Sequence, residues 1–204
     1  MEFYEAVRRR RMVRNYAEAP VDPGAVDRIV DAGRRTPSAG FSQGVAFVVV
    51  TDSELRSQIA DLANEPAYVA MGLDPWISRA PVHIVLCVSE EAYHRRYQET
   101  DKTNEDGSEI EWPVPYWWVD AGAAMQNMLV AAVAEDLAAG FLGAHAAPEI
   151  GAMLGVPDEY AIVGIITIGH PAPDRRSGSL QRGWRDQATV VHRDRWTGRT
   201  RPAS

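Results

Sequence analysis

Cysteine is almost absent from this chain of 204 residues. The single cysteine, Cys87, lies in the apolar run Val82–Val88, so no internal disulfide is possible and a small buried side chain is expected there. No apolar run approaches the roughly 18 residues that a membrane-spanning helix needs. The charged N-terminus lacks the apolar core of a secretory signal. We therefore expect a cytoplasmic protein that does not associate with membranes.

Positive charge is also scarce, because 21 lysines and arginines stand against 28 aspartates and glutamates and leave a formal net charge of −7. A dedicated nucleic-acid binder is usually strongly basic, so no nucleic-acid partner is expected. The five histidines show no metal-ligand spacing, so no metal is expected either. Neither a GxGxxG after the first predicted strand nor a Walker, HExxH, CxxC or nucleophile-elbow pattern is found. The sequence therefore points to no catalytic side chain.

Two polar segments near the N-terminus stand out against this background. Residues 8–14 contain five arginines in addition to a Met-Val pair, and a guanidinium group is a permanent charge whose planar fork fits phosphate oxygens. Residues 37–43 read Pro-Ser-Ala-Gly-Phe-Ser-Gln and lead into the apolar stretch 46–50. A loop of this kind, next to a buried strand, is a rigid place from which to present polar groups to a ring. Together the two segments indicate a site for a phosphorylated heterocyclic cofactor.

Hydrophobic periodicity predicts helices that alternate with about four strands. Asp22, and Asp52 or Ser53, are the expected N-caps of two helices, and Asp120 is the expected N-cap of the longest one, which would stop at Gly140. This order, with 46% hydrophobic residues, predicts one domain of the α+β or mixed α/β class around a single sheet. The expected helices cover 3–9, 22–35, 53–63, 120–139 and 148–154, and the expected strands cover 47–51, 82–88 and 161–168, with a short strand or turn at 141–146.

Residues 89–118 have the pattern of an insertion. A polar helix is followed by the stretch 101–108, which contains no apolar residue, and then by the aromatic run 112–118. A solvated loop beside an aromatic cluster indicates a lid that folds over a ligand, with Trp112, Tyr116 and Trp117 as candidate substrate or lid contacts. The alternative is an ordinary surface loop whose tryptophans pack on the core.

Five of these segments resemble, in order, the motifs of the FMN-dependent nitroreductase family. The family's Arg-Arg-Ser-x-Arg-x-aromatic motif corresponds to 10–16, and its Pro-Ser-x-x-Asn-x-Gln-Pro-Trp motif corresponds to 37–45. Its Gly-Ala-x-x-Gln-Asn-x-Leu-x-Ala-Ala helix corresponds to 122–132, its Gly-x-Pro-Ala to 169–172, and its C-terminal basic motif to 182–185. The resemblance covers nearly the whole chain.

This resemblance implies one nitroreductase-like domain over 1–204, in which 89–118 would be a lid insertion. It implies an α+β fold with a mixed antiparallel sheet flanked by helices, and an intertwined homodimer with FMN at its interface. The loop at 37–43 would meet the flavin ring, in many members from the other subunit, and the turn at 143–145 would bring a backbone N–H to flavin N5. The residues that it assigns to the cofactor are Arg10, Arg11, Met12, Arg14, Arg182 and Arg185 around the phosphate, and Pro37, Ser38, Ala39, Phe41, Gln43, Gly143, Ala144 and His145 around the ring.

The chain departs from the family pattern at three places. Met12 stands where serine is usual, Phe41 where asparagine is usual, and Gly44-Val45 where Pro-Trp is usual. The Gly-Phe-x-Gln form of the loop is closer to the branch that makes dimethylbenzimidazole from FMN. That branch carries an aspartate at the position of Met12, and a thioether cannot act as an acid or a base.

The resemblance thus implies an oxidoreductase that passes a hydride from NADPH or NADH through flavin N5 to an electron-poor acceptor such as a nitroaromatic or a quinone. Hydride transfer to a flavin requires no protein acid or base, which explains why no catalytic side chain stands out. Three alternatives stay open at this point: a non-catalytic protein that sequesters flavin, a flavin-cleaving enzyme, and a polyanion binder that uses the arginine cluster.

Overall fold

The computed structural model describes residues 1–143, 146–175 and 177–197, and its contacts divide the chain into a body, Met1–Asp174, and a tail, Arg175–Ser204. The tail contains two short 3-10 helices, η2 (Gly178–Arg182) and η3 (Gln187–Thr189). No described helix is both long and apolar enough to span a bilayer. The elements of the body are α1 (Phe3–Arg9), α2 (Pro23–Arg34), η1 (Ala39–Phe41), β1 (Val45–Val50), α3 (Ser53–Leu62), α4 (Glu65–Ala70), α5 (Trp76–Arg79), β2 (Val82–Val88), α6 (Glu91–Tyr97), α7 (Tyr116–Ala134), β3 (Ala138–Gly143), α8 (Ala147–Leu154) and β4 (Ala161–Gly169).

The body is built on one four-stranded sheet in the order β1-β2-β4-β3, and every pair of neighbouring strands is antiparallel. β2 is central and buried along its whole length, because helices cover both faces of the sheet. Its residues alternate between the two faces, so Ile84 and Leu86 pack in one core while Val85 and Cys87 pack in the other. This double coverage explains why its sequence is a continuous apolar run rather than an alternating one.

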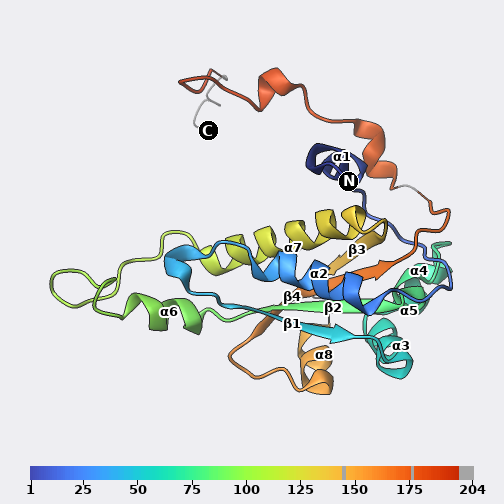
Figure 1. Cartoon of the computed structure of the whole chain (residues 1–204), viewed down its shortest axis with the longest axis horizontal. Coiled ribbons are helices and arrows are strands. Elements are labelled where there is room, and N and C mark those ends of the chain that lie inside the picture. The colour runs from blue at the N-terminus through green and yellow to red at the C-terminus, as the bar shows by residue number, and fades with distance from the viewer. Residues whose placement is uncertain (144–145, 176, 198–204) are drawn as a thin grey trace. The chain divides into compact units, whose positions relative to one another are not determined.

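Helices lie on both faces of the sheet (Figure 1). Two hydrophobic cores fill the space between the sheet and these helices. On one face, α2 and α7 lie side by side and bury Ile29 and Met128 against the strands. On the other face, α3, α5 and α8 contribute Ile59, Ile77 and Ile150. The result is the α+β arrangement of helices flanking an antiparallel sheet that the sequence predicts.

The predicted helix starts are confirmed where a side-chain cap is present. Asp22 accepts a hydrogen bond from the Gly24 N–H at the start of α2, and Asp52 accepts one from the Leu55 N–H at the start of α3. The predicted helix over 120–139 is wrong at both ends, because α7 begins at Tyr116 and ends at Ala134. Asp136 has a left-handed backbone (φ +56°) that breaks the helix, and the apolar residues after it form β3.

A buried histidine on β2 makes the stability of the fold depend on pH. His83 is fully buried, and its Nε2–H donates to the Ile77 carbonyl at 2.8 Å, while Nδ1 has no hydrogen-bond partner among the described residues. Burial disfavours the charged form and lowers the pKa of His83 from 6.5 to about 4, against a small opposing effect of the Ile77 hydrogen bond.

We expect this histidine to destabilise the folded protein as the pH falls. The unfolded chain takes up a proton near pH 6.5 and the folded chain only near pH 4, so stability is complete above pH 6.5 and declines below it, by about 3 kcal/mol at pH 4. Urea unfolding of the wild type and of His83→Gln between pH 4 and 8 measures this. The variant should lose most of the decline, and equal slopes for both proteins would contradict the prediction.

Candidate functional site

The arginine-rich segment is fixed to the edge of the sheet by its backbone. Met12 forms a parallel bridge with Ala139 of β3, and the Val13 N–H donates to the Ala139 carbonyl at 3.0 Å. Gly140 permits this approach, because a Cβ at that position would lie 2.6 Å from the Val13 carbonyl oxygen. The Met12 side chain packs against the core between the sheet, α2 and α7. The segment is therefore a rigid platform for the arginines that flank it.

Tyr16 anchors the far end of this platform. Its ring is buried, and its hydroxyl lies 2.7 Å from the Thr167 Oγ1 atom on β4 and donates or accepts within a network that includes the Val13 carbonyl. Burial raises the pKa of Tyr16 far above its usual value, although the Thr167 hydrogen bond opposes the rise. The aromatic residue of the first motif thus has a structural role in this chain.

The arginines of the cluster differ in how they are paired. Arg11 Nη1 lies 2.5 Å from an oxygen of Asp174, whose side chain is only 4% exposed. Burial of Asp174 opposes ionisation, but hydrogen bonds from the Arg14 N–H and from Arg11 outweigh it and lower the pKa of this carboxyl group. Arg9 pairs with Glu5 and with Asp136. The charge of Arg11 is therefore already balanced inside the protein.

Arg14 is the arginine best placed to bind an external anion. Its guanidinium group has no ion pair or hydrogen bond with any residue in the described part of the chain. It lies 5.8 Å from the centre of the Trp76 ring and lines a cavity of about 200 Å³. The other residues that line this cavity are Tyr68, Leu73, Trp76, Phe141, Leu142 and Gly143.

The resemblance also assigns the turn at 143–145 to the cofactor. Gly143 lines the Arg14 cavity at the end of β3, and its assignment to the flavin ring stays a prediction. Ala144 and His145 lie outside the described residues. Arg10 is partly buried where α1 ends, and no ion pair involves it among the described residues. Its assignment to the phosphate stays a prediction.

Arg182 and Arg185 belong to the tail, which is a separate unit. Within it, Arg185 Nη2 donates to the Thr189 carbonyl at 3.2 Å. No described residue of 177–191 is buried, and Trp184 is 95% exposed. The assignment of these two arginines to the phosphate stays a prediction.

The 37–43 segment forms a strained loop that is held together by hydrogen bonds within it. Gly40, Phe41 and Gln43 all have left-handed backbones, with φ of +60°, +60° and +51°. For a residue other than glycine this conformation costs about 1–2 kcal/mol. Ser38 Oγ accepts from the Gln43 N–H at 2.9 Å, and Ser42 donates to the Ala39 carbonyl at 2.6 Å. Pro37, Phe41 and Gln43 are exposed, and Phe41 is 71% exposed.

One protomer does not bring this loop to Arg14. The loop enters β1 at Val45, at one edge of the sheet, whereas the arginine segment lies beside Ala139 on β3, at the other edge and at the opposite end of the strands. Three strand spacings and about six residues of strand length separate the two corners by roughly 20–25 Å. Figure 1 shows η1 lying near α6 and far from the chain that follows α1.

The insertion is held by an aromatic cluster on α6 and α7. Trp112 stacks edge-on with Tyr97 at 4.6 Å between ring centres, and its Nε1–H donates to Glu109. Glu109 also lies 2.6 Å from His94 Nδ1, and this hydrogen bond is the main cause of a raised pKa of His94. Trp117 is buried in the core, whereas Tyr116 is 42% exposed. A lid function for Trp112 and Tyr116 stays a prediction, while the position of Trp117 is that of a packing residue.

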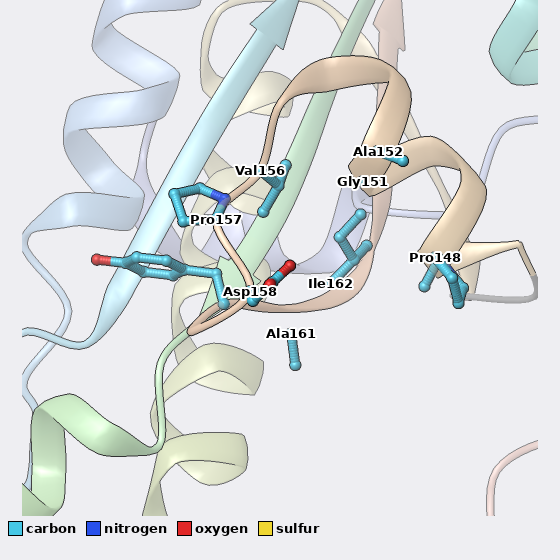
Figure 2. Close-up of a pocket in the computed structure, with 10 residues that line it drawn as sticks. Pro148, Gly151, Ala152, Val156, Pro157, Asp158, Ala161 and Ile162 are labelled. Atoms are coloured by element: carbon cyan, nitrogen blue, oxygen red, sulfur yellow. The ribbon is translucent and has the colours of Figure 1, made fainter.

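A larger hollow of about 440 Å³ lies between α8 and the start of β4 (Figure 2). Its walls are mainly small apolar residues such as Gly151, Ala152 and Ala161. Among the described residues that line it, Asp158 has the only charged side chain, and a carboxylate repels a phosphate. No described residue that lines this hollow offers a cationic side chain to a phosphate, so the cavity at Arg14 is the better candidate.

Several residues of the candidate site were missed by the sequence interpretation. Tyr68, Leu73 and Trp76 come from α4, α5 and the turn between them, which the sequence pattern did not predict. Glu65 holds this region in place, because its buried carboxylate accepts from the Ile77 N–H at 2.5 Å and from the Ser78 N–H at 3.2 Å. The Pro75-Trp76 pair before an apolar residue was the one available signal of a packed turn.

Comparison with known proteins gives consistent matches. A model of the nitroreductase family matches residues 7–170. The NADPH-flavin oxidoreductase of Vibrio harveyi is 28% identical over 169 residues, which are 82% of this chain and 65% of that protein. An FMN reductase (NAD(P)H) of Bacillus subtilis is 30% identical over 176 residues, which are 79% of this chain and 63% of that protein. The chain thus spans slightly less than two thirds of these two relatives.

Solved structures show the same fold. The NADPH:FMN oxidoreductase of Vibrio harveyi complexed with NAD+ superposes with a TM-score of 0.72 at 22% identity, covering 97% of this chain and 79% of that one. Nitroreductase A of Vibrio parahaemolyticus gives a TM-score of 0.73 at 24% identity, covering 98% and 79% of the two chains.

Proposed function

Because this chain belongs to the nitroreductase family, we propose that it is an FMN-dependent oxidoreductase that uses NADPH or NADH to reduce an electron-poor acceptor such as a nitroaromatic or a quinone. The names of its relatives, an NADPH-flavin oxidoreductase and an FMN reductase, support the cofactor and the reductant. When bound, FMN supplies the hydride chemistry, and the protein supplies binding, orientation and exclusion of water.

The observation that carries this proposal is that the Arg14 guanidinium group is partly buried and has no acidic partner among the described residues. A partly buried guanidinium group without a carboxylate partner among the described residues is costly unless an anion completes it. It stands at a cavity whose remaining walls are aromatic, aliphatic and glycine backbone. This donor set fits a molecule with a phosphate at one end and a flat apolar ring at the other. Arg14 would hold the phosphate, and Tyr68 and Trp76 would exclude water from the ring.

We further propose that the enzyme works as a homodimer and that each FMN lies between two copies. The Arg14 cavity lies at the β3 edge of the sheet and the 37–43 loop at the β1 edge, so a second copy is needed to bring them together. The exposed surface supports this: α1 presents Phe3 and Tyr4, which are 66% and 74% exposed, and α7 presents Val119, which is 53% exposed. Exposed apolar side chains on two helices that contact each other favour an interface.

The purified protein tests the function directly. We expect it to show the absorption of an oxidised flavin and to release FMN, identified by mass, on denaturation. Anaerobic NADPH or NADH should bleach the flavin band, and a nitroaromatic or a quinone should restore it. Bound flavin that no nicotinamide reduces would favour a sequestering protein. A chain that binds no FMN but shifts a polyanion in a salt-dependent way would contradict the proposal.

A further inference from the structure

The 37–43 loop contains residues with strained backbones that have no evident role within their own protomer. Phe41 and Gln43 both adopt left-handed backbones, and both side chains point to solvent. A connection whose only task was to join α2 to β1 could relax both residues at little cost. Strained residues of this kind persist where the surroundings over-determine them, and they cluster at functional sites. The fastening of the loop is therefore informative.

Two charged side chains from outside the loop fasten it. Asp120 was expected to be an N-cap, but it lies inside α7, and one of its carboxylate oxygens accepts from the Ala39 N–H at 2.9 Å and from the buried Tyr93 hydroxyl at 2.8 Å. Arg96 of α6 donates its Nε–H to the Gly40 carbonyl at 2.9 Å. Arg96 is itself held by a two-pronged pair with Asp101, at 2.7 Å for each contact. We call Asp120 and Arg96 the loop clamp.

We propose that Asp120, supported by Arg96, is a positioning residue of the flavin reaction, whose clamp holds the 37–43 loop in the shape that meets the flavin bound by a second copy of the chain. This inference rests on the proposed function. The clamp binds the peptide group that precedes Ala39 through its N–H, and the peptide group between the left-handed residues Gly40 and Phe41 through its carbonyl. It thus fixes the direction in which Phe41 leaves the loop.

A loop that has lost the clamp would spend only part of its time in the binding shape. The apparent Kd for FMN then rises by the inverse of that fraction. Because the lost hydrogen bonds have a charged acceptor, we expect Asp120→Ala to raise the Kd by about tenfold or more. Asp120→Asn keeps an oxygen that can accept both hydrogen bonds, so it should stay within about threefold of the wild type.

The experiment measures two properties in parallel. Hydrogen–deuterium exchange of the 37–44 segment, without flavin, reports the clamp itself, and titration of the apo-protein with FMN, with the visible circular dichroism of the bound flavin, reports its consequence. Glu135→Ala is the matched control, because Glu135 also joins α7 to another helix by a charged contact, to Arg28 at 2.7 Å, far from the loop. We expect faster exchange at Ala39, weaker FMN binding and altered dichroism in Asp120→Ala, and none of these in Glu135→Ala.

Each outcome decides one question. Faster exchange with unchanged FMN binding and dichroism would overturn the positioning role while leaving the proposed function intact. Wild-type protein that binds no FMN would overturn the proposed function and this inference with it. If Asp120→Ala does not fold, Arg96→Ala replaces it, since Arg96 belongs to neither hydrophobic core. Unchanged FMN binding in a folded Arg96→Ala with faster exchange would again overturn the inference.

Discussion

Arg14→Ala is expected to lower the affinity for FMN by about 100-fold or more, because two hydrogen bonds from a guanidinium fork to a phosphate together contribute about 3 kcal/mol or more. The variant should remain folded, since the Arg14 side chain makes no hydrogen bond with the described residues and only its backbone N–H binds Asp174. Fluorescence titration of the apo-protein with FMN gives the affinity, and far-ultraviolet circular dichroism gives the fold.

Two companion variants make the Arg14 result specific. Arg9→Ala removes a positive charge from the same cluster, but that side chain is 54% exposed and is paired with acidic residues, so FMN affinity should change little. Arg14→Lys keeps the charge and loses the fork, so it should restore binding only in part. If Arg14→Ala bound FMN as tightly as the wild type, the assignment of this cavity to the phosphate would be wrong.

Arg11 requires a different design because Asp174 depends on it. Arg11→Ala alone leaves a carboxylate that is 4% exposed without its charged partner, so lost affinity would also reflect local disruption. The double variant Arg11→Ala, Asp174→Asn removes the charge pair together. If this double variant still binds FMN, Arg11 stabilises the platform and does not contact the phosphate.

Local signals in the sequence predicted the parts of the fold that local physics determines. Asp22 followed by Pro23 marks the start of α2, and the apolar run Val82–Val88 marks the central strand. The longest helix was extended too far because Leu137 and Ala139 continue its apolar pattern. In the structure Leu137 precedes β3 and Ala139 lies in it, and the pairing of β3 with β4 joins residues 21 to 31 positions apart, which leaves no trace in a local pattern.

The chemistry of the site depended on contacts that are distant in sequence. The arginine motif indicated an anion, but the neutralisation of Arg11 by Asp174, 163 residues away, could not be inferred from spacing. Asp120 was interpreted as a helix cap because aspartates commonly cap helices, whereas its partner Ala39 lies 81 residues away. The sequence therefore predicted which residue types would bind a phosphate. The contacts made in the fold determine which individual arginines are free of internal partners among the described residues.

Gly122→Arg is expected to convert the protein to a monomer and to remove its flavin. Gly122 lies in the middle of α7, and a Cβ at this position would meet nothing within 4 Å in its own chain. Residues three and four positions away share its face of the helix, and two of them, Trp118 and Val119, are 44% and 53% exposed. Glycine inside a helix costs about 1 kcal/mol relative to alanine, so a lone chain would gain stability from almost any replacement.

A glycine in this position is useful only if another surface approaches it closely. In a homodimer that packs α7 against the second copy, an arginine at 122 would be buried without a partner, which costs about 3 kcal/mol or more and raises the dimer dissociation constant by at least about 100-fold. Light scattering after gel filtration measures the oligomeric state. Ala134→Arg, at an exposed position near the end of the same helix, adds the same charge and should leave the dimer intact. A Gly122→Arg variant that is dimeric and retains flavin would show that the second copy covers some other face, and the loop from the opposite corner of the sheet would then have to reach the cofactor by a different route.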